Sequence, residues 1–117
     1  MADNLADNRD QTTVIVQIED LAALDNVAEI AAVDGVDCLF IGRIDLAVAM
    51  GKGPSDPPVF DAVRKICVDC GDAAVGMFTP DTAELPDWQE AGASLFLLSS
   101  DQSMLLAGAN ALAQSIP

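Results

Sequence analysis

The stretch Thr13-Val-Ile-Val-Gln-Ile18, followed at once by Glu19-Asp20, decides the fold. Its apolar residues are β-branched and continuous rather than alternating, which is typical of a strand buried on both faces of a parallel sheet. Beyond it, apolar residues recur at helical spacing over residues 20–32, and Asp34-Gly35 marks the end of that helix. The segment is therefore predicted to be one βα unit.

The same pattern returns three more times along the chain. Further buried strands are predicted at Cys38–Ile41, Ala73–Phe78 and Ser94–Leu98. Helices are predicted over residues 44–50, from the proline pair at 57–58 to about residue 70, over 80–91, and from 102 to about 115. Four βα units with one extra short helix indicate an α/β fold, in which a parallel sheet is covered by helices.

Two architectures fit four βα units, and the pattern alone does not separate them. One is an open, doubly wound sheet of flavodoxin type, and the other is half of a (β/α)8 TIM barrel. A complete barrel takes about 250 residues, and the chain has 117. We expect one domain over residues 12–117, preceded by a polar arm at 1–11. No glycine-rich phosphate loop follows the first strand, which disfavours nucleotide binding.

Composition excludes several classes of function. Five Lys and Arg stand against 19 Asp and Glu, a net charge of −14, so nucleic acid and anionic membrane surfaces would repel the chain. The chain contains no His, and alone it builds neither a Ser-His-Asp triad nor a His general base. The polar N-terminus lacks a signal-peptide core, and no apolar run is long enough to span a bilayer, so we expect a cytoplasmic protein.

Cysteine usage agrees with that compartment. Three cysteines, an odd number, suggest reduced thiols rather than a disulfide framework. Cys67 and Cys70 have the spacing of a redox or zinc motif, but they lie inside a helical pattern without a second cysteine pair. We therefore expect Cys67 to be a small core residue and Cys70 to end the helix.

Two carboxylates lie at the ends of neighbouring strands. Glu19 comes just after the first strand and Asp45 just after the second, so both project from the carboxyl edge of a parallel sheet, where α/β folds bind ligands. Their oxygens suit a hard cation such as Mg²⁺ or Mn²⁺. Helix capping is an equally simple role: Glu19 or Asp20 would cap the next helix, and Asp45 the helix after it.

A family resemblance adds to this interpretation. It rests on Val14–Glu19, Ala28–Asp37, Leu39–Leu46 with Met50-Gly51, Val75–Phe78, and Leu97–Asp101 with Leu105-Leu106. From about residue 12 onward, the chain resembles the C-terminal half of the metal-dependent pyruvate aldolases of the HpcH/HpaI aldolase and citrate lyase family. The Gln-Ile-Glu and Gly-x-x-Asp-Leu elements, one βα unit apart, carry most of that resemblance.

The resemblance implies a fold, a reaction and site residues. Family members are (β/α)8 barrels, carbon–carbon lyases that cleave 4-hydroxy-2-oxo acids to pyruvate and an aldehyde. By the resemblance, Glu19 and Asp45 bind a divalent metal (Mg²⁺, Mn²⁺ or Co²⁺), which stabilises the enolate as the bond breaks. The backbone at Gly42, Ile44 and Asp45 matches the segment whose amides receive the carboxylate of a 2-oxo acid such as pyruvate.

The chain departs from the family pattern in two ways. Arg43 stands where the family usually has Pro, and its cation either contacts an anionic substrate or points to solvent. The family's catalytic His and its substrate-orienting Arg belong to the first half of the barrel, which this chain does not match. We therefore assign no catalytic residue, and expect the complete active site to lie beyond this chain.

A half-barrel has two open sheet edges and an apolar inner face. The simplest remedy is association, so we expect a homodimer or a larger oligomer, or a complementing N-terminal half-barrel. Two alternatives to a split aldolase remain. One is a non-catalytic half-barrel in which Glu19 and Asp45 persist as caps, and the other is a flavodoxin-like binding module.

Overall fold

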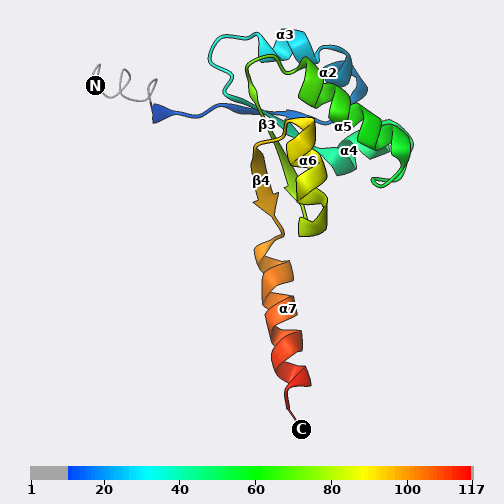
Figure 1. Cartoon of the computed structure of the whole chain (residues 1–117), viewed down its shortest axis with the longest axis vertical. Helices are drawn as coiled ribbons and strands as arrows, with labels where there is room; N and C mark the ends of the chain where they lie inside the picture. Colours follow the sequence, from blue (N-terminus) through cyan, green and yellow to red (C-terminus); the bar gives the residue numbers. More distant parts are fainter. Residues whose placement is uncertain (1–10, 117) are drawn as a thin grey trace.

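The computed structural model describes residues 11–116, and its centre is one sheet of four strands (Figure 1). The strands are β1 (Ile15–Ile18), β2 (Cys38–Ile41), β3 (Ala74–Thr79) and β4 (Leu95–Leu98). All pairings are parallel, and the spatial order β1-β2-β3-β4 is the order of the sequence. A doubly wound sheet reverses its order at a switch point, whereas a barrel adds each strand beside the last. The flavodoxin-like alternative is therefore wrong.

Helices connect the strands, and all but the last of them lie on one side of the sheet (Figure 1). They are α2 (Leu21–Asp25), α3 (Val27–Ala31), α4 (Arg43–Ala49), α5 (Pro57–Asp69), the 3-10 turn η1 (Thr82–Glu84), α6 (Leu85–Ala91) and α7 (Asp101–Gln114). The helix predicted over residues 20–32 is split, because Asn26 lies between α2 and α3 and its side-chain amide donates to the carbonyl of Ala22 at 2.8 Å. The helix predicted over 80–91 starts as η1 and becomes α helical only at Leu85.

The core lies between the sheet and α5 and α6. Alternate strand residues face the helices, since successive side chains point to opposite faces of a sheet. Residues of α5 spaced three or four apart pack against them, as the helical repeat requires. Its fully buried members include Ile18, Leu39, Ile41, Val75, Met77, Val59, Val63, Ile66 and Trp88. Burying one such aliphatic side chain stabilises a fold by about 1.5–3 kcal/mol.

The other face of the sheet is uncovered in a single chain. Ile15, Gln17, Phe40, Leu95 and Leu97 line a shallow hollow of about 260 Å³ there, and Leu97 is 54% exposed. Within residues 11–116, no further strand pairs with the outer sides of β1 and β4. An apolar inner face between two free edges is what the half-barrel prediction requires.

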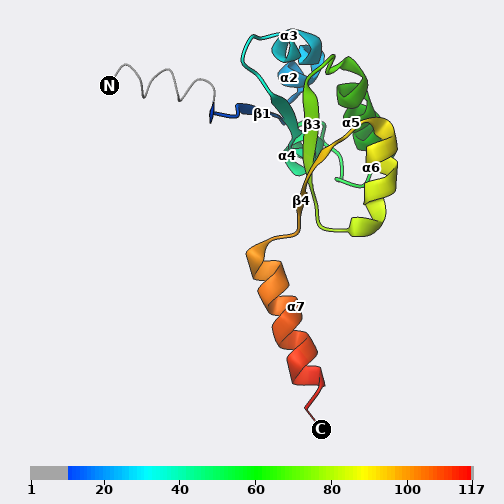
Figure 2. The ribbon, with the colours of Figure 1, turned by 60° about the vertical axis from the view of Figure 1, so that its left-hand side comes forward.

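Helix α7 stands away from the sheet (Figures 1 and 2). Every residue of α7 is exposed, including Met104, Leu105, Leu106 and Leu112, and the chain extends over 61 × 43 × 25 Å. The predicted last helix is confirmed, but it has no packing partner among the described residues. Most of the expected polar arm, residues 1–10, lies outside the part of the chain that the structure describes.

The cysteines pack as small apolar residues. Cys38, Cys67 and Cys70 are buried free thiols, and the Cys70 Sγ donates to the Cys67 carbonyl at 3.1 Å. The predicted core position of Cys67, with Cys70 at the end of α5, is confirmed. Over residues 11–116, no helix has the length and apolar character needed to cross a bilayer.

Candidate functional site

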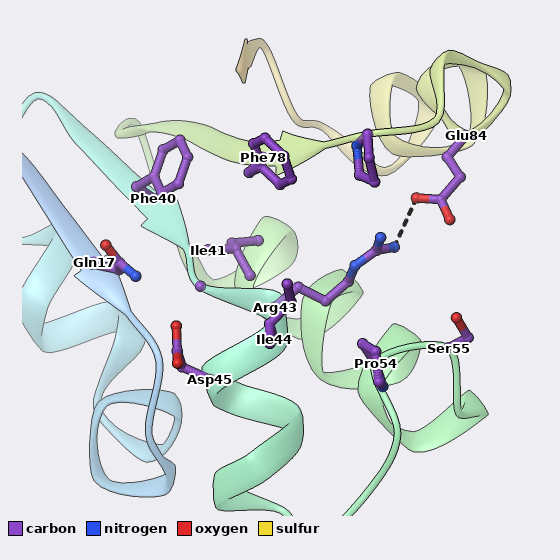
Figure 3. A pocket seen from close by; sticks show the side chains of 12 residues that line it. Gln17, Phe40, Ile41, Arg43, Ile44, Asp45, Pro54, Ser55, Phe78 and Glu84 are labelled. Atoms are coloured by element: carbon purple, nitrogen blue, oxygen red, sulfur yellow. Dashed lines mark hydrogen bonds and ion pairs between the residues drawn. The ribbon is translucent and has the colours of Figure 1, made fainter. Parts of the chain in front are cut away.

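A pocket of about 380 Å³ opens at the carboxyl ends of β1, β2 and β3 (Figure 3). Its walls include Gln17 from β1, Phe40 from β2, Phe78 from β3, and Asp45 from the start of α4. The parallel strands bring these side chains together, because all their carboxyl ends meet at one edge of the sheet. Of the sequence-predicted site residues, Gly42, Ile44 and Asp45 line this pocket, and Glu19 is not among its lining residues.

Gln17 and Glu19 form the wall of the site on the β1 side. They are two residues apart, so they project from the same face of the strand segment. The Gln17 Nε2 donates to the Glu19 Oε2 at 2.6 Å. Glu19 thus has one carboxylate oxygen oriented by a neutral donor, and no cation pairs with it among the described residues.

Gly42 lets the end of β2 lie directly against this pair. A Cβ at position 42 would be 2.6 Å from the Gln17 Nε2 and 2.9 Å from the Glu19 Cβ, closer than real side chains pack. Its φ of −80° is open to any residue, so the close approach, and not the backbone conformation, requires glycine here.

Asp45 reaches the same place from α4. It lies in the first turn of that helix, three residues after the N-cap Gly42, and projects toward β1 on the side of the pocket that carries Gln17 (Figure 3). Of the two sequence-predicted metal ligands, Glu19 thus packs against Gly42, and Asp45 lies one helical turn further along the chain.

The predicted cap by Glu19 or Asp20 is confirmed for Asp20 and not for Glu19. Asp20 caps α2, accepting from the backbone amide of Ala23 at 2.7 Å. Helix α4 begins at Gly42 without a side-chain cap, and Asp45 lies inside its first turn. Both Glu19 and Asp45 are exposed carboxylates with acceptor capacity to spare.

The donor set fits a hard divalent cation. Among the described residues, no cluster of three or more His, Cys, Asp or Glu side chains is placed to hold a metal. Mg²⁺ usually takes one or two protein carboxylates and fills its other positions with water or substrate oxygens. Two carboxylates beside an open pocket match that habit, and they do not match the closed four-ligand set of structural zinc.

Some backbone groups at the start of α4 already form hydrogen bonds within the fold. The Gly42 amide donates to the Ile18 carbonyl at 3.0 Å, and the Gly42 carbonyl accepts from the Leu46 amide at 2.8 Å. The first amides of a helix have no acceptor within it, and those of Ile44 and Asp45 lie in this first turn. Of the three predicted substrate-binding positions, Gly42 allows β2 to lie close to Gln17 and Glu19. Ile44 and Asp45 keep backbone N–H groups that are available to donate to a ligand.

Arg43 is directed into the packed part of the fold rather than to solvent. Its side chain is 12% exposed, and its Nη1 donates to the Glu84 Oε2 at 2.7 Å (Figure 3). Its Cζ lies 5.6 Å from the ring centre of Phe60 and 5.8 Å from that of Trp88. The expectation that Arg43 points to solvent is wrong, because an ion pair and two aromatic rings hold the guanidinium; the contact with an anionic substrate stays a prediction, since Arg43 lines the pocket.

Sequence reasoning missed four residues around the site. Gln17 had a detectable signal: it is a polar residue on the Glu19 face of an otherwise apolar strand. Glu84, Phe60 and Trp88 had none, since they meet Arg43 only through packing of segments far apart in the chain.

Comparison with known proteins gives a consistent result. The HpcH/HpaI aldolase/citrate lyase family model matches residues 3–107. The chain is 34% identical over 119 residues to the 5-keto-4-deoxy-D-glucarate aldolase of Shigella boydii, covering 98% of this chain and 46% of that protein. The crystal structure of an HpcH/HpaI aldolase/citrate lyase family protein from Burkholderia cenocepacia matches with a TM-score of 0.89 and 37% identity, over 97% of this chain and 46% of the other.

A further solved structure matches the chain, and in all three comparisons the chain covers about half of the other protein. The HpcH/HpaI aldolase of Desulfitobacterium hafniense matches with a TM-score of 0.81 and 27% identity, over 99% of this chain and 48% of the other. The chain spans about half the length of the curated relatives it matches. Its four βα units correspond to about half of a TIM-barrel-like aldolase. The matched region includes Gln17, Glu19, Gly42 and Asp45, and the chain belongs to the HpcH/HpaI aldolase/citrate lyase family.

Proposed function

We propose that this chain is the C-terminal half of a divalent-metal-dependent aldolase that cleaves 4-hydroxy-2-oxo acids to pyruvate and an aldehyde. The observation that carries the proposal is the position of the two carboxylates at one edge of the sheet: Asp45 lines the pocket, and Glu19 packs against Gly42, the residue at which α4 begins. The relatives named 5-keto-4-deoxy-D-glucarate aldolase act, by that name, on a keto sugar acid, which supports the substrate class.

The chain's own residues supply a cation site and a carboxylate site. Glu19 and Asp45 hold Mg²⁺, Mn²⁺ or Co²⁺, and Gln17 keeps the Glu19 carboxylate oriented. A cation held there supplies Lewis-acid stabilisation of the negative charge that develops on the 2-oxo group. The amides of Ile44 and Asp45 donate to the carboxylate of a 2-oxo acid such as pyruvate, because the helix leaves them without acceptors.

The chain offers no His for proton transfer. A general base needs a group that exchanges protons near neutral pH within reach of the substrate. We propose that the complementing N-terminal half supplies this group. The chain by itself then binds the cation weakly and does not turn over substrate.

Assembly follows from the uncovered surfaces. We propose that a second copy of the chain covers the inner face of the sheet, which a single copy leaves open between the free edges of β1 and β4. The exposed apolar side chains of α7 add to the surface that association would bury. The cytoplasmic location stays a prediction, and the buried free thiols support a reducing compartment.

Sedimentation velocity tests the assembly. Leu97→Asp places a charge on the inner face and is expected to shift a dimer toward monomer at micromolar concentration. Val68→Asp, on the outer side of α5, is the matched control and is expected to leave the dimer intact. A parent chain that sediments as a stable monomer contradicts the proposed dimer.

Calorimetric titration with Mg²⁺ and Mn²⁺ tests the metal site. We expect binding heat in the parent chain, its loss in Glu19→Gln and in Asp45→Asn, and its retention in Glu90→Gln, which changes an exposed carboxylate of α6. Heat that is equal in all variants contradicts the site and favours the non-catalytic half-barrel, whose supporting observation is the open inner face.

A pyruvate-release assay tests the reaction. With a 4-hydroxy-2-oxo acid as substrate, the chain alone is expected to release no pyruvate. Addition of the N-terminal half of the Shigella boydii relative is expected to restore turnover, and to do so only while Glu19 and Asp45 are intact. Turnover by the chain alone overturns the proposed inactivity.

A further inference from the structure

We propose that Arg43 is a positioning residue for Asp45. Its guanidinium locks the first turn of α4 against α5 and α6, and so fixes the direction in which Asp45 projects. The inference rests on the proposed function, since it concerns the geometry of the same cation site.

The guanidinium is held from several directions. The Nη1 donates to the Glu84 Oε2 at 2.7 Å, a charge-assisted hydrogen bond in a part-buried setting. The Cζ lies within 6 Å of the ring centres of Phe60 and Trp88, the range in which a cation is attracted to an aromatic face. One polar and two aromatic contacts leave the side chain little freedom to move.

The partners of Arg43 are themselves fixed. Trp88 is 2% exposed, and its ring stacks on Phe60 with centroids 5.1 Å apart and 7° between the planes. The Glu84 Oε2 also accepts from the Trp88 Nε1 at 3.1 Å, and the buried Thr79 Oγ1 lies 3.5 Å from the same oxygen. The guanidinium is therefore anchored to the core rather than to a loose surface group.

Arg43 and Asp45 lie on opposite sides of α4. A helix turns about 100° per residue, so two residues apart means about 200° around the axis. Figure 3 shows this arrangement, with Arg43 directed to Glu84 and Asp45 directed to β1. Contacts that hold Arg43 on one side of the first turn therefore also set the direction in which Asp45 projects on the other side.

The first turn of α4 needs such a support. The helix has seven residues, too few to be stable without tertiary contacts. Leu46 and Ala47 are buried and anchor the later part of the helix, but Asp45 comes before them, in the first turn. Arg43 is the residue of that turn that reaches into the packed part of the fold, since Ile44 and Asp45 are exposed.

The decisive variant is Arg43→Met, measured by Mn²⁺ binding. Loss of a nearby positive charge alone would tighten the binding of a cation, by Coulomb's law. Loss of positioning would weaken it, and altered support of a metal ligand typically changes metal affinity by 10-fold or more. We expect a rise of roughly tenfold in the Mn²⁺ dissociation constant. Arg64→Met, an exposed arginine of α5, is the control for net charge and is expected to show no weakening.

Hydrogen exchange of the metal-free chain gives a second readout that does not depend on the cation. Arg43→Met is expected to speed amide exchange over residues 43–50, and to leave β3 protected. Arg43→Lys keeps the charge but loses the planar stacking group, so its effects are expected to have the same sign and a smaller size. The lysine variant keeps the test valid if the methionine variant does not fold.

The outcomes separate the two proposals. Unchanged exchange in α4 of folded Arg43 variants, or a Mn²⁺ affinity that stays equal or tightens, overturns the positioning role. If the parent chain binds no Mn²⁺ at all, the proposed metal site fails. Faster exchange in α4 would then still show that Arg43 supports the first turn, and the link to Asp45 as a metal ligand would be overturned.

Discussion

Gln17 donates its side-chain amide to the carboxylate of Glu19 across 2.6 Å, along one face of a single strand segment. The donor is neutral, so it orients the carboxylate without cancelling its charge. A ligand that is already oriented loses less conformational freedom when it binds a cation. In the proposed metal site, Gln17 would therefore be a supporting residue that keeps Glu19 oriented, and this role can be tested separately.

Gln17→Leu is expected to weaken Mn²⁺ binding by roughly tenfold, the lower end for lost support of a metal ligand. Because Gln17 is exposed in the single chain, the free energy of unfolding is expected to change by no more than about 0.5 kcal/mol. Titration calorimetry and urea unfolding measure the two quantities. Gln89→Leu, at an exposed position of α6, serves as the control. Equal Mn²⁺ affinity in Gln17→Leu and Gln89→Leu contradicts the supporting role.

Gly42→Ala is expected to disturb the site through one methyl group. The new Cβ would lie 2.6 Å from the Gln17 Nε2 and 2.9 Å from the Glu19 Cβ, so both must move. Overpacking of this kind costs about 1–3 kcal/mol, and Mn²⁺ binding is expected to weaken with it. Thermal unfolding and Mn²⁺ titration measure the two effects.

Gly108→Ala is the matched control for that substitution. A Cβ there meets nothing within 4 Å, and the residue lies inside α7. Alanine favours a helix over glycine by up to about 1 kcal/mol, so this variant is expected to be neutral or more stable. If Gly42→Ala behaves like Gly108→Ala, the close approach at Gly42 does not constrain the site.

The sheet was predictable because each strand carries its own local signal. Continuous β-branched and apolar runs predicted β1 to β4, and the edge rule for parallel sheets predicted that Glu19 and Asp45 follow strands ending at the same edge. The break at Asn26 was not predictable in the same way. It depends on a polar side chain that bonds to a backbone carbonyl inside an otherwise regular apolar pattern.

Contacts between distant segments set the limit of prediction. The Arg43–Glu84 pair joins residues 41 positions apart, and nothing local to Arg43 announces it. The apolar residues of α7 indicated a helix with an apolar surface to bury, but a hydrophobic pattern does not identify the surface against which the helix packs. The detachment of α7 therefore followed only from the structure.

Stability is expected to depend on the buried side of α5. Ile66 is completely buried and Val68, two residues further on, is 78% exposed. Ile66→Ala removes packed atoms and is expected to lower the free energy of unfolding by about 2–5 kcal/mol. Val68→Ala is expected to change it by no more than about 0.5 kcal/mol. Urea unfolding of both variants measures the difference, and similar losses would mean that the helix buries a different face.

The buried thiols are expected to make the chain less stable in alkali. Burial, followed by the neighbouring Cys70, raises the pKa of Cys67, and burial, followed by Asp37, raises that of Cys38. The folded chain thus holds these protons more tightly than the unfolded chain. The contribution of the two protonated thiols to the free energy of unfolding is complete below about pH 8.5, the pKa of a free thiol. It is lost as the pH rises through their raised pKa values in the folded chain.

Urea unfolding between pH 7 and 10 measures this loss, and the window is favourable because the chain has no Tyr and only two Lys. The double variant Cys38→Ala/Cys67→Ala is expected to flatten the curve. Iodoacetamide at pH 8 is expected to label the folded chain slowly and the unfolded chain quickly, since the thiolate is the reacting form. A parent chain with pH-independent stability and rapidly labelled thiols would mean that neither cysteine is shielded.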